Sequence, residues 1–365
     1  MKSNLFKIGL AGLLGLGAVS TSQAATKLDM ATPWGGGIML EYVARGAAAN
    51  MELFTSNNVK VEVFPGGTLG KALKVTDTVK KGVAQIGHNW SGYDWGVDKT
   101  AILFGGFAGS MDWDKMMHWV FRGGGKEMWM DWRMAEFGVA AFPCGSAPRE
   151  LFAHSHKPIR SLADYKGMKV RTAGAWAEIA EKLGASTVIL AGAEVYPALE
   201  RKVVDAIEWG TPTHNIVMGF EKVAKYIVVP GVHQPIAMHE CAVNKKTWNA
   251  MSDMEKKQIT AGGKMMTWDL YTKLGHDDAP NWMTYVNSKK NEIIDLPQSF
   301  KDAAKKATDE WAEETGKKAN DYFFNIFGDE EKINSELKKY NISSNCFKTV
   351  SYTHLRAHET SLHLV

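Results

Sequence analysis

The sequence predicts an α/β protein of two lobes, joined by strands that cross between them. Three observations support this fold class. Short strands and amphipathic helices alternate near the N-terminus, and the same alternation restarts at Lys169. Roughly 325 residues remain when both chain ends are set aside, which exceeds what one hydrophobic core usually serves. No low-complexity linker or internal repeat separates the two blocks, so several chain crossings and a cleft between the lobes are expected.

The first block alternates strand, helix and strand, which predicts parallel pairing with right-handed crossovers. The expected elements are strand 27–32, helix 38–54, strand 59–64, helix 69–81 and strand 84–88. A segment rich in Trp, Met and charge, 111–136, is predicted to be helical. The apolar segment 137–144 is predicted to be a strand that leads into the second lobe.

The second block repeats this pattern with strand 169–171, helix 176–183, strand 187–190, helix 195–202 and strand 203–207. Thr211 and Pro212 fit the N-cap and first position of a helix that runs to residue 224. Segment 237–243 is another strand candidate, and the chain from residue 245 onward is charged and helical, including 303–340. We therefore expect lobe I at 25–142 with 238–290, and lobe II at 143–237 with 291–349.

Both ends of the chain read as segments outside the fold. Lys2 and Lys7 flank a short apolar run, and the small residues Ser22 and Ala24 follow, which predicts a signal peptide over 1–24. The apolar run is shorter than the ~20 residues of a membrane-spanning helix. Residues 350–365 resemble a translated sequencing adapter and are predicted to be an artefact; a natural polar tail is the alternative.

The net charge and the cysteine content exclude several kinds of binding partner and of structural site. Without the two ends the net charge falls from +3 to near +1, so neither nucleic acid nor an anionic membrane is a predicted partner. Cys144, Cys241 and Cys346 are odd in number and lack metal-type spacing. Buried free thiols are favoured, and a single Cys144–Cys241 bridge is the alternative because both residues lie near predicted strand ends.

Two predicted strand ends carry the residues that best suit a ligand. Arg171 ends the strand 169–171, and Glu208 with Trp209 follows the strand 203–207. Ligands of open α/β sheets bind beyond the carboxyl ends of the strands, and the planar fork of arginine suits a carboxylate. The alternatives are a structural salt bridge at Arg171 and direct pairing of Glu208 with Arg171. A carboxylate beside a bound organic anion otherwise requires a cation, and oxygen ligands suit Na⁺, Ca²⁺ or Mg²⁺.

Other motifs are weaker. His154, His156, His233 and His239 show no zinc-type spacing and are expected to be surface or hydrogen-bonded residues. The glycine triplets 35–37 and 123–125 lack the context of a phosphate-binding loop. No GxSxG motif or persuasive catalytic triad is present. Aromatic residues in or near strand-end loops could form the walls of a small-ligand site: Trp34, Trp90, Tyr93 and Trp209.

Several of these segments together resemble one family. They read DYKGMKVR at 164–171, KLGA at 182–185, EVYPALE at 194–200 and VDAIEW at 204–209. From Lys27 to about Thr349 the chain resembles the substrate-binding proteins of tripartite ATP-independent periplasmic (TRAP) transporters, the DctP-type family. FEKVAKY at 220–226, PGVHQP at 230–235 and VNKK at 243–246 are similar to the branch that binds 2-oxo acids and lactate with a cation.

The resemblance implies a two-lobed periplasmic binding protein with a ligand cleft, a hinge of lobe-crossing strands and long C-terminal helices. It implies a periplasmic solute-binding protein, not an enzyme, that captures a 2-oxo or 2-hydroxy monocarboxylate. The implied cofactor is Na⁺ or Ca²⁺ bridging protein and ligand, with no organic cofactor. The implied partners are the small and large membrane subunits of the transporter. A long C-terminal helix also allows a homodimer.

The resemblance also assigns residues. Arg171 would hold the ligand carboxylate, while Glu208, the Trp209 carbonyl and Gln234 would surround the metal. Independently of the resemblance, we expect Trp34, Asn89, Tyr93 and Trp209 to complete the ligand site. Relatives use a glutamine a little over twenty residues before the arginine, and this chain instead reads APREL at 147–151. Either Glu150 replaces that glutamine, or Arg149 adds a second positive group and the metal is lost or altered.

Two other functions stay open at this point. One is a ligand-presenting subunit for a sensor or chemoreceptor. The other is a metal-assisted periplasmic hydrolase or lyase in which Glu208 works with a histidine base such as His88 or His233.

Overall fold

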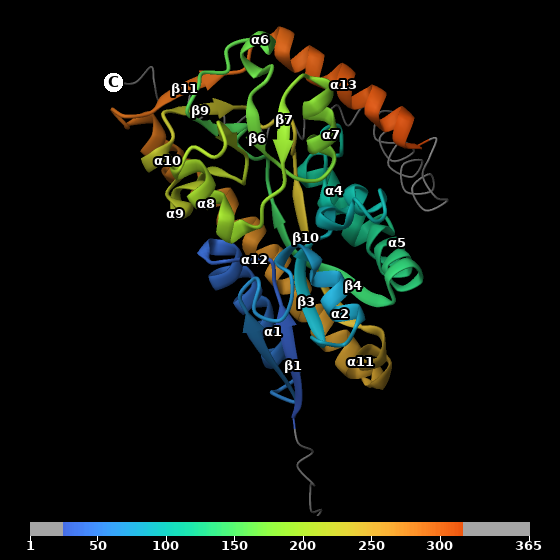
Figure 1. The fold of residues 1–365 in the computed structure, drawn as a ribbon. Coiled ribbons are helices and arrows are strands. Elements are labelled where there is room, and N and C mark those ends of the chain that lie inside the picture. Colours follow the sequence, from blue (N-terminus) through green and yellow to red (C-terminus); the bar gives the residue numbers. More distant parts are fainter. Residues whose placement is uncertain (1–24, 317–365) are drawn as a thin grey trace, which may run out of the picture.

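The structure, a computed structural model, describes residues 25–316 (Figure 1). The predicted signal peptide, the helical segment beyond residue 316, Cys346 and the tail 350–365 lie outside the described residues. Within them, two mixed sheets form the two halves of an α/β molecule, which confirms the predicted fold class. No helix in this part of the chain combines the length and the apolar character needed to span a bilayer.

The first sheet has five strands in the order β2-β1-β3-β10-β4. Their bounds are Thr26–Ala31 (β1), Val59–Phe64 (β2), Ile86–Trp90 (β3), Val139–Ala147 (β4) and Ala237–Asn244 (β10). β1 pairs in parallel with β2 and β3, and β10 lies antiparallel between β3 and β4. In β2 the valines at alternate positions are buried, which is the pattern expected of a strand with one face on the core.

The second sheet has six strands in the order β11-β9-β5-β8-β6-β7. Their bounds are Ala153–Ser155 (β5), Lys169–Arg171 (β6), Ser186–Val188 (β7), Ala206–Ile207 (β8), Tyr226–Val229 (β9) and Glu292–Asp295 (β11). β6 is parallel to both β7 and β8, and Arg171 is the register partner of Ile207. This register places the side chains at the ends of β6 and β8 next to each other.

Helices cover both sheets. Their bounds are Arg45–Phe54 (α1), Val75–Lys80 (α2), Ala101–Gly105 (α3), Trp113–Arg122 (α4), Gly125–Trp132 (α5), Leu162–Tyr165 (α6), Ala175–Lys182 (α7), Gly192–Glu200 (α8), Pro212–Met218 (α9), Phe220–Val223 (α10), Lys245–Ala250 (α11), Asp253–Val286 (α12) and Gln298–Gly316 (α13). Short π or 3₁₀ segments are Met39–Ala44 (η1), Ala72–Lys74 (η2), Ser91–Asp94 (η3) and Arg133–Phe137 (η4).

Two predicted helices are interrupted at glycines. The segment 111–136 is not one helix, because the chain turns at Gly124, whose φ of 90° an L side chain rarely adopts. The helix expected to run from 212 to 224 begins as predicted, with Thr211 at the N-cap and Pro212 after it, and then breaks at Gly219 with φ 77°. The expected helix 69–81 is shorter and begins only at Ala72.

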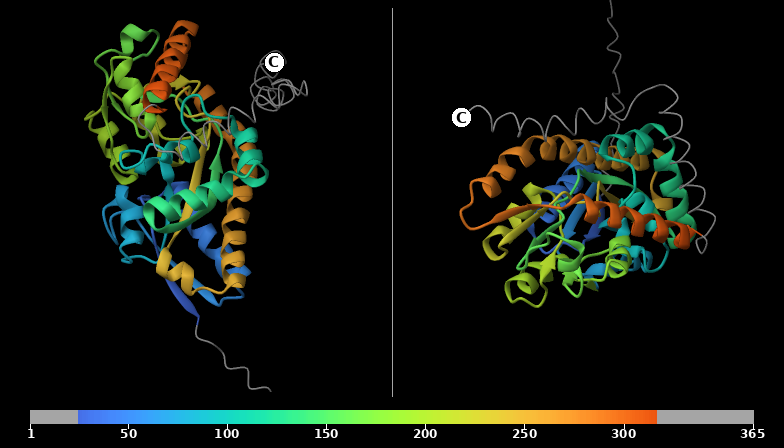
Figure 2. Two further views of the ribbon diagram at one scale, coloured as in Figure 1. Left: turned by 90° about the vertical axis from the view of Figure 1, so that its right-hand side faces the viewer. Right: turned by 90° about the horizontal axis from the view of Figure 1, so that it is seen from above.

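α12 joins the two halves along one side of the molecule and is the long orange helix in Figure 2. Its first half packs closely on α1 and β4 because it presents glycines there. A Cβ on Gly262 would lie 2.8 Å from the Met51 backbone nitrogen. At its other end, Asp278 Oδ1 accepts hydrogen bonds from Thr211 Oγ1 (2.8 Å) and the Thr213 backbone N–H (3.0 Å).

The chain passes between the two sheets at 148–152, at 230–236 and along α12. These passages support the expectation of several crossings between the halves. The predicted division after residue 142 falls within β4, all nine residues of which belong to the first sheet. The exact lobe limits stay a prediction.

A buried charge cluster fixes the loop after β3. The Arg133 guanidinium contacts Glu240 on β10, and its Nη1 lies 2.8 Å from Asp94 Oδ2 in η3. Trp129 Nε1 donates to Glu240 Oε2 at 2.9 Å. A buried arginine is tolerated only when paired and hydrogen-bonded in this way. The cluster holds η3, and with it Tyr93, against the sheet.

The expectation of free thiols was wrong for two of the three cysteines. Cys144 on β4 and Cys241 on β10 form a disulfide, with Cα atoms 5.3 Å apart. The two residues are 97 positions apart in the sequence, and only the antiparallel pairing of β4 with β10 brings them together. Sequence spacing carries no signal for such a pairing, which the tertiary fold determines.

We predict that replacing both cysteines by serine (Cys144→Ser with Cys241→Ser) lowers the free energy of unfolding by roughly 2–4 kcal/mol. The bridge closes a long loop and so restricts the unfolded chain. The melting temperature should fall by about 3–8 °C. Thermal unfolding followed by circular dichroism measures the effect. Equal melting temperatures, under conditions that keep the wild-type protein oxidised, would show that the bridge does not stabilise the fold.

Candidate functional site

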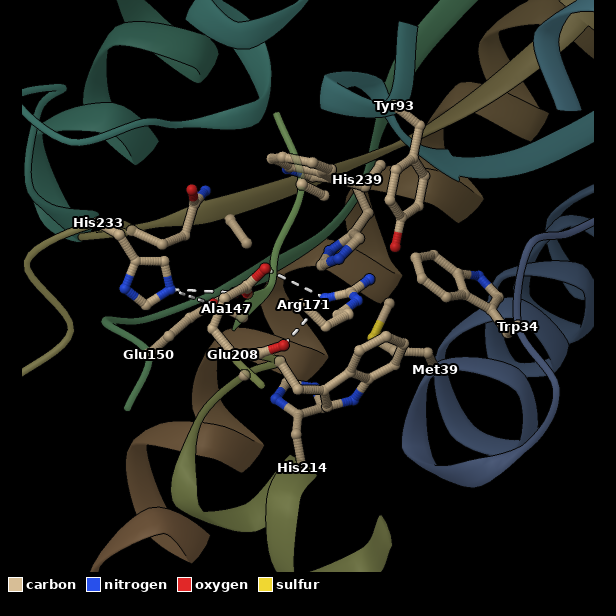
Figure 3. Close-up of a pocket in the computed structure, with 16 residues that line it drawn as sticks. Trp34, Met39, Tyr93, Ala147, Glu150, Arg171, Glu208, His214, His233 and His239 are labelled. Atoms are coloured by element: carbon tan, nitrogen blue, oxygen red, sulfur yellow. Dashed lines mark hydrogen bonds and ion pairs between the residues drawn. The ribbon is translucent and has the colours of Figure 1, made fainter. Parts of the chain in front are cut away.

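A pocket of about 580 Å³, including its mouth, lies where the two halves meet (Figure 3). Both sheets supply its walls. The lining residues are Trp34, Met39, Trp90, Tyr93, Ala147, Glu150, Arg171, Ala173, Glu208, Trp209, Gly210, His214, His233, Gln234, Ala237 and His239.

Arg171 lies at the carboxyl end of β6 and is 2 % exposed. Its Nη1 donates to the Glu208 carbonyl (2.9 Å) and to Glu208 Oε1 (3.1 Å), and its Nη2 donates to the Leu190 carbonyl (3.0 Å). The direct Arg171–Glu208 pairing that we kept as an alternative is thus present. These contacts fix the guanidinium plane, and in Figure 3 the Tyr93 hydroxyl points toward it.

Glu208 uses its two oxygens differently. Oε1 contacts Arg171, while Oε2 lies 3.6 Å from His233 Nε2. Burial acts to raise the pKa of Glu208, but the positive charge of Arg171 and the contact with His233 outweigh it and lower the pKa. Glu208 is therefore a carboxylate in the folded protein.

Glu150 is a second buried carboxyl group, and its Oε2 lies 3.1 Å from His233 Nε2. Burial and the nearby charge of Glu208 raise the pKa of Glu150. Burial alone would lower the pKa of His233, yet its contacts with the two carboxylates raise it. The two groups share a proton in a dry environment, because neither can carry its charge alone there.

Aromatic rings form the opposite wall. Trp34, in the loop after β1, is held by a hydrogen bond from its Nε1 to His88 Nδ1 at 2.8 Å. Tyr93 packs edge-on against Trp90, with ring centroids 5.2 Å apart. The Trp209 indole lies 5.1 Å from Arg171 Cζ and stacks on the cation. A ligand in this pocket would have an arginine on one side and flat apolar surfaces on the other.

Two further histidines present neutral nitrogens. Burial lowers the pKa of His214 to about 4, and burial with the neighbouring His88 and His214 lowers the pKa of His239 well below its usual value. His214 Nε2 and His239 Nδ1 have no hydrogen-bond partner within residues 25–316. They are available to hydrogen-bond a polar group of a ligand.

Seven predicted site residues line this pocket: Trp34, Tyr93, Glu150, Arg171, Glu208, Trp209 and Gln234. Asn89 and Arg149 do not. Side chains alternate along β3, so Asn89 faces away from the side on which Trp90 reaches the pocket. Arg149 is exposed, and its Nη1 donates to the Gly231 carbonyl at 3.3 Å.

Our sequence reasoning missed the role of His233 beside its neighbour Gln234. The Gln234 amide donates to the Gly105 carbonyl at 3.2 Å and to the Ile236 carbonyl, and is not part of the carboxylate cluster. His233 contacts both carboxylates instead. The segment 230–236 is neither helix nor strand, so no periodicity indicates which of two adjacent side chains points inward.

The glycine triplet 35–37 lies where the loop after β1 meets the opposite half. A Cβ on Gly35 would lie 2.5 Å from Ala193 Cβ and 2.8 Å from Ala193 Cα at the start of α8. Only a residue without a side chain permits this close contact between the loop after β1 and the opposite half. The triplet therefore belongs to the contact between the halves, in keeping with its lack of a phosphate-loop context.

Residues 43–318 match the family described as bacterial extracellular solute-binding protein, family 7 (DctP). The chain belongs to this family. It is 27% identical over 292 residues to the monocarboxylate 2-oxoacid-binding periplasmic protein of Nostoc sp., covering 79% of each chain.

Solved structures agree with this assignment. A TRAP solute-binding protein of Bordetella bronchiseptica, a dimer with calcium and picolinate in one site, has a TM-score of 0.85 at 22% identity. The match covers 92% of this chain and 100% of the Bordetella chain. A TRAP periplasmic solute-binding protein of Pseudoalteromonas atlantica, with sodium and pyruvate, has a TM-score of 0.81 at 25% identity. The match covers 88% of this chain and 98% of the Pseudoalteromonas chain.

The DctP-family pocket of this chain also offers a group that suits a cation. Glu150, Glu208 and His233 each present one potential ligand atom, and these atoms lie within 4.8 Å of one another. All three side chains are buried. Two carboxylate oxygens and an imidazole nitrogen form a chemically reasonable donor set for a metal ion.

We predict a pH-dependent stability that originates in the Glu150–His233 pair. Both pKa values are raised in the folded protein, so each group's contribution to stability is lost as pH rises. The loss begins above the unfolded-state pKa of each group, about 4.3 for Glu150 and about 6.5 for His233. Without ligand or divalent cation, the free energy of unfolding should fall by on the order of 1–3 kcal/mol above pH 6.5.

The control is the double variant Glu150→Gln with His233→Gln. Its free energy of unfolding should fall much less above pH 6.5 than that of the wild-type protein. Denaturant unfolding of both proteins from pH 6 to pH 9.5 measures the difference. The four buried neutral histidines, His88, His154, His214 and His239, act in the opposite direction at lower pH and are common to both proteins. Parallel pH profiles for the two proteins would contradict the shared proton.

Proposed function

We propose that this solute-binding protein captures a small organic acid, a 2-oxo or 2-hydroxy monocarboxylate, together with a cation, and delivers it to the membrane subunits of a TRAP transporter. The observation that carries the proposal is Arg171, a fixed and buried cation in a pocket between two lobes. A buried positive charge with aromatic neighbours suits a small carboxylate. The names of the Nostoc and Pseudoalteromonas relatives support the same ligand class.

In this proposal the ligand carboxylate binds at the Arg171 guanidinium beside the Tyr93 hydroxyl. Trp34 and Trp209 pack on the ligand from the two halves, so that all contacts are made together only when the halves are closed. Closure then follows from binding, because a ligand shifts the equilibrium toward the state that it contacts best. His214 and His239 hydrogen-bond a second polar group of the acid.

We infer that the chain performs no covalent chemistry on the acid. The family consists of solute-binding proteins. The two histidines considered above as possible bases make other contacts. His88 contacts Trp34 Nε1 and, at 3.2 Å, the Cys144 carbonyl, and His233 Nε2 lies between two carboxylates.

We propose that the protein works in the periplasm after removal of residues 1–24. The Cys144–Cys241 disulfide supports this location, because such bonds persist mainly in oxidising compartments. The Nostoc relative is named a periplasmic protein. Transfer to a small and a large membrane subunit, and a homodimer formed through the C-terminal helix, are further parts of the proposal.

The ligand role of Arg171 is tested by Arg171→Lys. Lysine keeps the charge and loses the planar fork, so we expect affinity for the acid to fall by roughly 30- to 150-fold, or about 2–3 kcal/mol. Isothermal titration calorimetry against pyruvate and lactate measures it. Arg149→Lys is the matched control, because Arg149 is exposed and outside the pocket lining. Equal affinities for wild type and Arg171→Lys would remove Arg171 from the ligand site.

The role of lobe closure is tested at Gly35, which does not line the pocket. In Gly35→Ala the new methyl group meets Ala193 and should hold the halves apart, at a cost of roughly 1–3 kcal/mol in the closed state. Acid affinity should fall by about 5- to 150-fold. Gly96→Ala is the control, since a Cβ there meets nothing within 4 Å. Unchanged affinity in Gly35→Ala would contradict the proposed closed bound state.

A further inference from the structure

The carboxylate cluster contains an imidazole where the sequence reasoning expected only oxygen ligands. Glu150 lies in the passage after β4, Glu208 at the end of β8, and His233 in the passage between β9 and β10 (Figure 3). His233 Nε2 lies 3.1 Å from Glu150 Oε2 and 3.6 Å from Glu208 Oε2. Three segments far apart in the sequence thus converge on one point.

The position of Arg171 shapes this cluster. Arg171 Nη1 contacts Glu208 Oε1, which leaves Glu208 Oε2 directed at His233 and Glu150. The guanidinium therefore occupies one side of Glu208 and keeps its second oxygen for the cluster. Gln234 Nε2 donates to the backbone carbonyls of Gly105 and Ile236, and these bonds hold the amide beside the cluster.

The donor types favour a particular class of metal. Na⁺ and Ca²⁺ prefer sites built from oxygen alone, whereas imidazole suits Zn²⁺ and other divalent first-row transition metals. Imidazole nitrogen and carboxylate oxygen are both ligands that Zn²⁺ takes in proteins.

The charges favour a divalent cation over a monovalent one. Two carboxylates and Arg171 leave one net negative charge in a buried site, and a bound monocarboxylate adds a second. A divalent cation beside a neutral imidazole balances both charges, whereas Na⁺ leaves one uncompensated. Uncompensated buried charge is costly, so the neutral arrangement is favoured.

We propose that Glu150, Glu208 and His233 Nε2 form a binding site for a divalent first-row transition metal, with Zn²⁺ as its representative. This inference deepens the proposed function by naming the class of cation that accompanies the acid. His233 is the residue that separates this site from an oxygen-only site. The competing occupant of the same position is the proton on His233 Nε2, which hydrogen-bonds Glu150.

The test begins with the full-length protein, stripped with EDTA and studied without any organic acid. Calorimetric titration with Zn²⁺, Co²⁺ and Ca²⁺ at fixed sodium concentration gives three affinities and their stoichiometry. We expect one Zn²⁺ or Co²⁺ per chain, bound at least about 100-fold more tightly than Ca²⁺. Ca²⁺ binding as tightly as Zn²⁺, or no divalent cation binding, would overturn the proposal.

His233→Gln tests the imidazole directly. An amide oxygen replaces a nitrogen ligand, so Zn²⁺ affinity should fall at least about tenfold while Ca²⁺ affinity changes little. The visible absorption of bound Co²⁺ should change or disappear in this variant. His276→Gln is the control, because His276 is exposed on α12 and its loss should affect neither metal. Unchanged Zn²⁺ affinity and Co²⁺ spectrum in a folded His233→Gln variant would exclude His233 as a ligand.

Two controls separate loss of metal binding from loss of the fold and from loss of acid binding. Circular dichroism checks the fold of each variant, and Glu150→Gln should produce the same loss of Zn²⁺ affinity if His233→Gln does not fold. The wild-type metal selectivity does not depend on any variant. Acid binding is measured separately in EDTA and with Zn²⁺. Acid binding without transition-metal binding would reject only this inference, whereas metal binding without acid binding would reject only the proposed function.

Discussion

Two carboxylates in one buried pocket are the constraint on which this site depends. Glu150 and Glu208 are almost excluded from water, and neither could remain there charged without a positive partner. Arg171 compensates Glu208, and His233 lies between the two. The pocket can accept an organic anion only if this balance is kept. Its charges are thus arranged in advance of any ligand, and removing one partner would disturb all the others.

The backbone positions these groups through strand ends and passages between the sheets. Parallel pairing of β6 with β8 brings Arg171 beside Glu208. Glu150 and His233 come from two of the segments that cross between the halves. A movement of one half relative to the other would therefore act on the carboxylate cluster as well as on the aromatic walls. The close contact of Gly35 with Ala193 shows how near the two halves approach at the mouth.

The sequence predicted most of what regular structure determines. Arg171 and Glu208 were found because strand ends in α/β sheets gather ligands, and β2 and β6 have the predicted limits. Asn89 does not line the pocket; the predicted strand ended at residue 88, so alternation along β3 was not available to orient Asn89. The role of His233 was not predicted, and the Cys144–Cys241 bridge was kept only as the alternative to free thiols, because an irregular passage and a long-range strand pairing leave little local pattern. The strands β5, β9 and β11 are short and were missed for the same reason.

The central claim is that the pocket holds a small organic acid. Mass spectrometry of the small molecules released by denaturing the protein, purified from cells without added ligand, tests this most directly. We expect one carboxylic acid in near-stoichiometric amount, which rebinds unchanged to the refolded or ligand-free protein. Recovery of a sugar, a phosphate ester or an amine without a carboxylate, or conversion of the rebound acid into a different product, would contradict it.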